Sequence, residues 1–275
     1  MLNRIILGTA NFTQQYGVLS SKVLDREEVK KILEQAFQSG ILTLDTAFGY
    51  GDMFHNFLSN VPKRFTINTK FSLKDDLKSV YENLKSLSRY KIDVLMVHDP
   101  QNIQKVKQKS VRDFFNRLKE ENIIRRVGIS VYDEDEVNQF ATLVCKPDVI
   151  QIPLNPLNQI FNHRKFKQYV YENNIEIQAR SLFLQGVLLS SELPGALSPL
   201  KETIETLRKN LGSYPSVLSG LCAWACQNEW VNKWVLGVSS TSDLDEICRS
   251  ASGELKGTVL DLHASNHPLV DPRNW

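Results

Sequence analysis

The stretch DREEVKKILEQAFQSGILTLD, residues 25–45, predicts a helix that leads into a strand. Asp25 and Glu28 have the spacing of a capping box, which begins helices. Gly40 suits the left-handed residue that ends a helix, and the apolar run 41–45 then reads as a strand. Apolar residues between them recur at the spacing of one buried helix face: Val29, Ile32, Leu33 and Ala36.

The same alternation continues along the chain. Strands are predicted at 4–8, 41–45, 65–70, 93–99, 125–130, 148–153, 175–181 and 234–239. After the helix within 25–40, further helices are predicted near 74–89, 103–121, 133–143, 163–174, 201–228 and 243–250. Eight strands, each followed by a helix, favour a parallel sheet with right-handed crossovers. No linker rich in Pro, Gly or Ser divides the 275 residues, so we expect one domain over 1–275.

Such a sheet either closes into a barrel or stays open as a doubly wound sheet. In an open dinucleotide-binding sheet the first strand runs into a G-x-G-x-x-G turn. Here it runs into GTANFTQQYG, residues 8–17, which does not match. We therefore expect the α/β class and a single-domain (β/α)8 TIM barrel.

Composition excludes several classes of partner. Hydrophobic residues make up 42% and charged residues 23% of the chain, as in globular proteins, and the net charge is +2. That charge gives no field to recruit nucleic acid, and no apolar run reaches the length of a membrane span. The start of the chain lacks a signal-peptide core. Four cysteines without a Cys/His cluster predict free thiols and a cytoplasmic location, and no obligatory protein partner is evident.

Charged or polar side chains end three consecutive strands. Asp45 ends the second, Lys70 the third and His98 the fourth, while Tyr50 follows Asp45 between Gly49 and Gly51. Active sites of such barrels lie at these strand ends, and neighbouring strands are only about 4.8 Å apart. We expect Asp45 to pair with Lys70, Lys70 to lower the pKa of Tyr50, and the two glycines to let the loop turn.

Taken singly, each residue also has a plain structural explanation. Asp45 and Lys70 could form a buried ion pair, His98 could be a hydrogen-bonded strand end, and Tyr50 could be a loop aromatic. Their occurrence in consecutive units favours a site that gives a proton to the oxygen of a carbonyl compound.

These residues resemble the Asp, Tyr, Lys and His tetrad of the aldo-keto reductases, in the segments LDTAFGYGD, NTKF and MVHDP. The resemblance covers essentially the whole chain and implies a catalytic tetrad of Asp45, Tyr50, Lys70 and His98. It also implies reduction of an aldehyde or ketone by NAD(P)H, without a bound metal. The implied cofactor-binding residues are Ser130, Gln151, Arg180, Ser181, Leu182, Gln185, Gly186, Gly237, Val238, Ser239, Ser240 and Asp243.

The cofactor segments depart from the family pattern in places. Val131 stands where many members have Asn, and Arg180 stands where many stack a Tyr on the nicotinamide. NADP(H) is favoured by family habit and NAD(H) stays possible, because Asp243 would repel a 2′-phosphate, a repulsion that Arg249 could offset. Gln151 and the pair Ser239–Ser240 could instead be simple strand-end caps.

The expected substrate is a small aldehyde, ketone or sugar-like carbonyl compound. Phe12, Tyr16, Phe48 and Phe183 could form apolar walls for it, or could simply pack. The main alternative is a slow-turnover or non-enzymatic regulatory module that binds a nicotinamide nucleotide on the same fold. A metal-dependent barrel hydrolase fits poorly, because His98 alone of the five histidines lies at a strand end.

Overall fold

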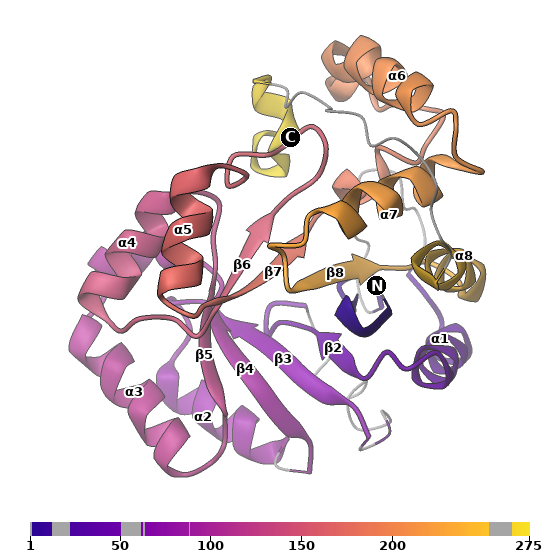
Figure 1. Ribbon diagram of the computed structural model, residues 1–275. Coiled ribbons are helices and arrows are strands. Elements are labelled where there is room, and N and C mark those ends of the chain that lie inside the picture. Colours follow the sequence, from indigo (N-terminus) through magenta and orange to yellow (C-terminus); the bar gives the residue numbers. More distant parts are fainter. Residues whose placement is uncertain (1, 13–22, 51–61, 63, 88, 253–265) are drawn as a thin grey trace.

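Eight parallel strands close into a barrel, which confirms the predicted TIM-barrel fold (Figure 1). The computed structural model describes residues 2–12, 23–50, 62, 64–87, 89–252 and 266–275. In barrel order the strands are β1 Ile5–Gly8, β2 Thr43–Asp45, β3 Thr66–Phe71, β4 Lys91–Val97, β5 Arg126–Ser130, β6 Val149–Pro153, β7 Glu176–Arg180 and β8 Lys233–Gly237. β8 pairs with β1 and so closes the barrel.

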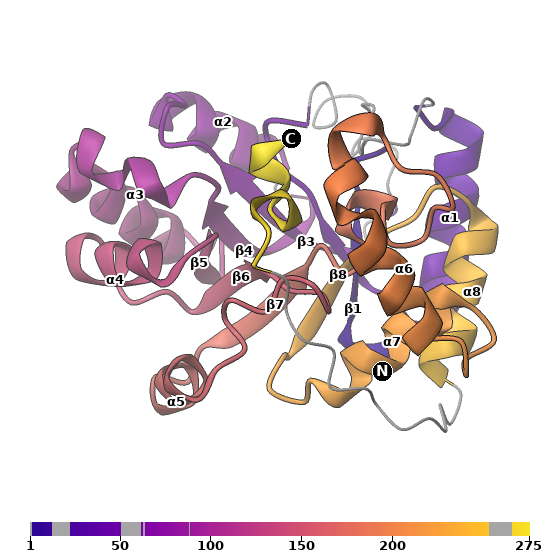
Figure 2. The same cartoon turned by 90° about the horizontal axis from the view of Figure 1, so that it is seen from above.

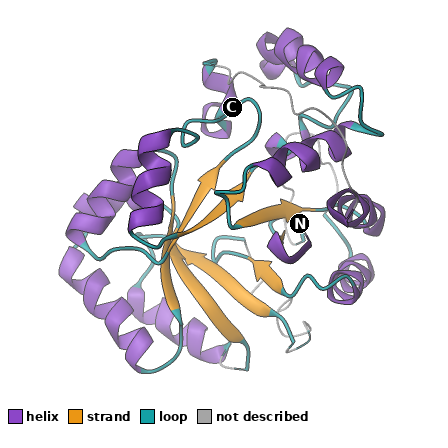
Figure 3. Ribbon diagram, viewed as in Figure 1, coloured by secondary structure: helices purple, strands orange, loops and turns teal. Residues whose placement is uncertain are grey.

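The helices surround the barrel (Figure 3). They are α1 Arg26–Gln38, α2 Leu77–Ser86, α3 Gln108–Glu120, α4 Glu134–Leu143, α5 Arg164–Glu172, α6 Lys201–Asn210, α7 Val217–Gln227 and α8 Thr241–Ser252. Short 3-10 helices are η1 Leu2–Arg4, η4 Pro100–Lys105, η5 Leu184–Gly186, η6 Gly195–Leu200, η7 Pro268–Val270 and η8 Pro272–Asn274. After β2, the described residues 46–50, 62 and 64 form no helix, so a helix after every strand is not seen there.

The first helix forms as its sequence predicts. The Asp25 carboxylate accepts a hydrogen bond from the Glu28 backbone N–H at 2.8 Å, and Glu28 accepts one in return from Asp25 N–H at 3.1 Å. The predicted apolar positions Val29, Ile32, Leu33 and Ala36 are buried. Gly40 has φ +80°, the left-handed conformation that ends helices.

The helix predicted over 201–228 is wrong in one respect, because the structure has two helices there, α6 and α7. Tyr214 precedes a proline, which disfavours the helical conformation, and Pro215 lacks the backbone donor that a continuing helix needs. A new helix then begins at Ser216, whose hydroxyl accepts from Ser219 N–H at 3.0 Å. The region 103–121 likewise begins as η4 before α3.

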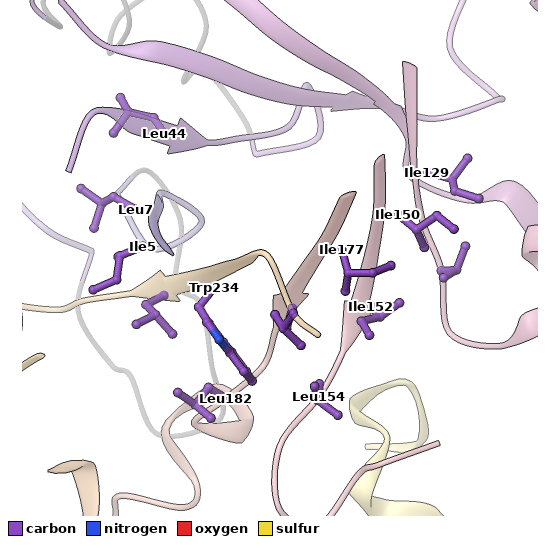
Figure 4. Packing of buried hydrophobic residues seen from close by; sticks show 14 of the residues in the cluster. Ile5, Leu7, Leu44, Ile129, Ile150, Ile152, Leu154, Ile177, Leu182 and Trp234 are labelled. Atoms are coloured by element: carbon purple, nitrogen blue, oxygen red, sulfur yellow. The ribbon is translucent and has the colours of Figure 1, made fainter. Parts of the chain in front are cut away.

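Alternate side chains of each strand face opposite sides of the barrel wall. One set is apolar and buried in the layer between strands and helices, where it forms the main core with the helices (Figure 4). The labelled members of this set on the strands are Ile5, Leu7, Leu44, Ile129, Ile150, Ile152, Ile177 and Trp234. The other set of strand side chains fills the barrel interior.

The interior set combines an apolar cluster with buried polar side chains, such as Asn68 and Gln178. Val94, Met96 and Val149 form a separate buried cluster beside Gly128. A Cβ on Gly128 would lie 2.9 Å from Met96 Cγ, so the glycine makes room for these neighbours. The next interior positions on β4 and β6 are His98 and Gln151, which therefore point toward the barrel mouth.

Candidate active site

Asp45 and Lys70 form a buried ion pair at the ends of β2 and β3. The Lys70 ammonium contacts Asp45 Oδ1 and also donates to the Thr46 carbonyl at 3.2 Å. Both side chains are nearly inaccessible, at 2% and 4% exposure. Charges this deeply buried are stable only when paired, so each residue fixes the other.

Gln151, on β6 across the barrel, completes this network. Its side-chain amide N–H donates to Asp45 Oδ2 at 2.8 Å. Its amide oxygen is buried and has no hydrogen-bond partner among the described residues. Gln151 was expected only to bind the cofactor or to cap a strand end. Its bond to Asp45, which joins residues 106 positions apart, was not predicted.

Tyr50 lies above this pair in the loop that follows β2. The loop is fixed by backbone hydrogen bonds from Phe48 N–H to the Lys70 carbonyl at 2.8 Å and from Tyr50 N–H to the Ala47 carbonyl at 3.1 Å. The Lys70 nitrogen is 5.7 Å from the centre of the Tyr50 ring. The loop therefore brings the phenol close to the ion pair.

The expectation that Gly49 provides backbone freedom here is wrong. Gly49 does not have a left-handed φ, and an added Cβ would meet no atom within 4 Å. The loop is held by its hydrogen bonds to β3 instead. Gly51, the other predicted glycine, lies outside the described residues.

His98 is the first residue after β4. Its backbone N–H donates to the Phe71 carbonyl at 2.9 Å. Its ring meets the Tyr50 ring edge to face, with centres 6.4 Å apart and planes at 82°. The four side chains predicted from three strand ends and one loop thus lie together at the barrel mouth.

The surroundings change the proton affinities of both rings. Burial raises the pKa of Tyr50, the Asp45 carboxylate raises it further, and the Arg180 cation opposes both. The expectation that Lys70 lowers the pKa of Tyr50 is thus not met, since Lys70 is paired with Asp45 and Arg180 is the opposing cation. Burial, followed by the charges of Lys70 and Arg180, lowers the pKa of His98 to about 4, although the residue keeps an exposed face.

A cavity of about 580 Å³ opens beside Asp45 and Tyr50, whereas Lys70 and His98 are not in its wall. Its size lies within the range of small-molecule and cofactor sites. The predicted residues that line it are Asp45, Tyr50, Gln151, Arg180, Ser181, Leu182, Gln185, Gly186, Gly237, Ser239 and Asp243. Three predicted cofactor residues, Ser130, Val238 and Ser240, are not in its wall. Ser130 and Val238 are buried behind it.

The predicted aromatic walls are only partly present. Phe183 lines the cavity, whereas Phe12 is buried in the core and Phe48 packs against the core's edge. Tyr16 lies outside the described residues. The apolar part of the wall therefore comes largely from residues that the sequence analysis did not select, such as Leu189 and Leu218.

The segment after β7 contributes backbone in a rare conformation. Ser181, Leu184, Gln185 and Gly186 have φ of 65°, 46°, 53° and 88°. Left-handed backbone is costly for residues other than glycine and concentrates at functional sites. Within this turn the Leu184 and Gly186 N–H groups donate to the Ser181 and Phe183 carbonyls, both at 2.9 Å, so the turn is fixed by its own backbone. Gly186 alone gave a sequence signal for this turn.

At the other end of the cavity, Asp243 lies in the first turn of α8. Its carboxylate accepts from Ser239 N–H at 2.8 Å, and its own N–H donates to the Ser240 hydroxyl at 3.0 Å. Ser240 therefore begins the helix as a cap, which was the structural alternative for it. Arg249 donates to the Asp245 carbonyl within α8.

Arg180 reaches the mouth from the end of β7. Its guanidinium donates to the Val131 carbonyl at 3.2 Å and to the Ser181 hydroxyl at 3.4 Å, and its central carbon is 4.2 Å from the centre of the Tyr132 ring. The sequence analysis selected Arg180 but missed Tyr132, because no local pattern distinguishes this tyrosine. No carboxylate within the described chain pairs with Arg180.

Metal ligands, membrane-spanning helices and disulfides each bear on the type of site. Among the described residues, no three or more of His, Cys, Asp and Glu are arranged to hold a metal ion. No described helix is both long and apolar enough to cross a membrane. The four cysteines are thiols and form no disulfide, as predicted.

Comparison with solved structures finds the same fold in several aldo-keto reductases. The aldo-keto reductase AKR11C1 from Bacillus halodurans, in its holo form, has a TM-score of 0.70 at 18% identity, covering 94% of this chain and 88% of that one. The glycerol dehydrogenase AKR11B4 from Gluconobacter oxydans has a TM-score of 0.67 at 18% identity, with the same two coverages. No curated protein matches the sequence.

The family model for the Aldo/keto reductase family matches residues 4–261, nearly the whole chain. Its members are oxidoreductases that act on small carbonyl compounds and generally bind a nicotinamide cofactor. The matched range contains all eight strands and every residue of the tetrad. The chain is therefore an enzyme that belongs to the aldo/keto reductase family.

Proposed function

We propose that the protein reduces an aldehyde or ketone to an alcohol, with Tyr50 as the proton donor. The observation that carries this proposal is the arrangement at the mouth. A phenol and a histidine lie above a buried Lys70–Asp45 pair, and Tyr50 and Asp45 line a cavity of ligand size. Sugar-like carbonyl compounds are included, because the wall offers polar as well as apolar groups.

The direction of the pKa shifts suits this role. Tyr50 stays protonated at neutral pH, since burial raises its pKa. It can still give up this proton to an alkoxide, which is a stronger base than a phenolate. His98 is neutral at neutral pH, since its pKa is about 4, and so orients the carbonyl oxygen through an uncharged N–H.

Lys70 acts here as a member of an ion pair. Burial and the Asp45 carboxylate both raise the pKa of Tyr50, so the phenol stays protonated above the pair. Asp45 is held by both Lys70 and Gln151. The pair therefore fixes the floor beneath the phenol and keeps the surrounding polar groups oriented.

When bound, a reduced nicotinamide cofactor supplies the hydride that this reduction needs. The chain fits it in three respects: the cavity volume, the unpartnered Gln151 amide oxygen at the floor, and the left-handed turn after β7. Gln151 and Arg180 would hold the nicotinamide end, and Ser181, Leu182, Gln185 and Gly186 the diphosphate.

For the adenosine end we propose NAD(H) rather than the family-based expectation of NADP(H). Asp243 presents a carboxylate in the cavity wall, where it would repel a 2′-phosphate and accept a hydrogen bond from a free ribose hydroxyl. Arg249 bonds within its own helix, and Arg180 is the only Lys or Arg in the described wall.

The test is Tyr50→Phe, which removes the proton donor and keeps the ring. Loss of general acid catalysis should lower turnover of carbonyl substrates by about 10²–10⁴-fold. Cofactor binding, followed by quenching of protein fluorescence, should stay unchanged. Near-normal reduction by this variant would refute the assignment. Tight cofactor binding by the unmodified protein without turnover of any carbonyl compound would support the regulatory module instead.

A further inference from the structure

The C-terminal segment 266–275 is folded against the barrel mouth. It contains η7 and η8 and lies between α6 and the helices α2–α4 in Figure 2. Val270 is buried, and the Trp275 indole N–H donates to the Leu269 carbonyl at 2.8 Å. The segment lies beyond residues 4–261, so its role does not follow from the family match.

Arg273 links this segment to the candidate active site. Its guanidinium carbon is 3.8 Å from the centre of the Tyr132 ring, the same ring that Arg180 contacts at 4.2 Å. Two arginines thus contact the same tyrosine ring, one from the C-terminal segment and one from the cavity wall.

Two carboxylates balance the added charge. Asp271 accepts from Arg273 at 2.6 and 2.9 Å. Glu136 is buried, with one oxygen 4.0 Å from the Arg273 guanidinium. The other Glu136 oxygen accepts from the Tyr132 backbone N–H at 2.6 Å. Both Arg273 and the backbone of Tyr132 are therefore fixed, and the ring that both arginines contact has a defined position.

Arg180 itself is weakly held by comparison. Its two hydrogen bonds are long, at 3.2 and 3.4 Å, and no carboxylate pairs with it in the described part of the chain. The Tyr132 ring is its remaining support. Arg180 lines the same cavity as Tyr50, and its charge acts on both Tyr50 and His98.

We propose that Arg273 is a positioning residue, which fixes the Arg180 guanidinium beside Tyr50 and His98 through the ring of Tyr132. The proposal rests on the proposed function only in giving Tyr50 and His98 their roles. It makes the C-terminal segment a working part of the active site, although the segment supplies no atom to the reaction.

The test is the NMR titration of the His98 ring proton in Arg273→Gln. The charged groups that act on His98 are Lys70 and Arg180, which lower its pKa, and Asp45 and Asp99, which raise it. If Arg180 loses its position, its average field weakens and the His98 midpoint rises from about 4 toward the ordinary value of about 6.5. Arg180→Met gives the upper limit of this rise.

The variant should also lose about 2- to 5-fold in kcat/KM, the size of a single cation–π contact. Tyr132→Leu should raise the His98 midpoint as well, whereas Tyr132→Phe, which keeps the ring face, should preserve it. Arg117→Gln is the matched control, because Arg117 also stacks on a tyrosine, Tyr81, at 4.0 Å and pairs with a carboxylate. It should leave the His98 midpoint unchanged.

An unchanged His98 midpoint in folded Arg273→Gln, with Arg180→Met raising it, would overturn the proposal. Circular dichroism establishes that each variant is folded. The titration needs no substrate, so its result is separate from that of Tyr50→Phe. Full activity of Tyr50→Phe would refute the proposed function. The titration alone would then decide whether Arg273 positions Arg180.

Discussion

Replacement of Lys70 by methionine should destabilise the protein strongly. Methionine fills a similar volume but carries no charge, so the Asp45 carboxylate would stay buried with only the Gln151 amide as its described side-chain donor. Removing one partner of a buried ion pair typically costs about 3–5 kcal/mol, because the other charge is left uncompensated. Lys70 and Asp45 belong to this class, with side chains only 2% and 4% exposed.

The size of the effect on the melting temperature follows from the chain length. Unfolding entropy of about 2.1 cal/mol/K per residue gives about 0.6 kcal/mol/K for 275 residues. A loss of 3–5 kcal/mol then lowers Tm by about 5–9 °C. The double variant Asp45→Asn/Lys70→Met removes both charges and keeps an acceptor for Gln151. It should recover most of this stability while its turnover stays low.

Urea unfolding followed by circular dichroism measures the change, and carbonyl reduction is assayed on the same samples. Lys109→Met is the control, since Lys109 pairs with Asp113 on the surface at 83% and 55% exposure. Its effect should stay within about 0.5 kcal/mol. The reasoning fails if Lys70→Met and Lys109→Met unfold alike, or if the double variant is as unstable as Lys70→Met.

Three further predictions concern the cofactor, pH and packing. Asp243→Asn should narrow the proposed preference for NADH over NADPH, measured as the ratio of the two dissociation constants, by about 10-fold or more. The same ratio in the variant and in the unmodified protein would contradict this. The pKa of His98 is lowered to about 4 from about 6.5, so its contribution to stability is complete above pH 6.5 and is lost as pH falls toward 4. Urea midpoints should therefore fall more steeply over that range in the unmodified protein than in His98→Gln. Gly128→Ala should cost about 1–3 kcal/mol, because its Cβ would lie 2.9 Å from Met96 Cγ, whereas Gly49→Ala should be nearly neutral in the same unfolding measurement.

The fold could be predicted because its signals are local. Helix caps, the spacing of apolar residues and short apolar strands each occupy fewer than about 20 residues, and barrel topology then orders the strands. The side chains at the mouth followed from the same logic. Asp45, Lys70 and His98 end consecutive strands, so parallel pairing alone brings them to one edge. Where α6 ends and α7 begins could also have been foreseen from Pro215.

Contacts between distant parts of the chain could not be predicted in this way. The bond from Gln151 to Asp45 crosses the barrel interior, and the contact between Tyr132 and Arg273 joins the end of β5 to the C-terminal segment. The degree of burial could not be predicted either. Burial raises the pKa of Tyr50, whereas we expected from the sequence that Lys70 would lower it. Such effects depend on which strands face each other, which a single sequence does not reveal.

Gln151 shows how stability and function meet in the interior of the barrel. A buried amide oxygen without a partner costs about 1–3 kcal/mol, and a purely structural role at Asp45 would not require it. A methionine there would remove that cost but would also remove the second donor to Asp45. The Gln151 amide N–H thus serves the ion pair, while its oxygen has no partner in the described part of the chain, which agrees with the proposed role at the cofactor.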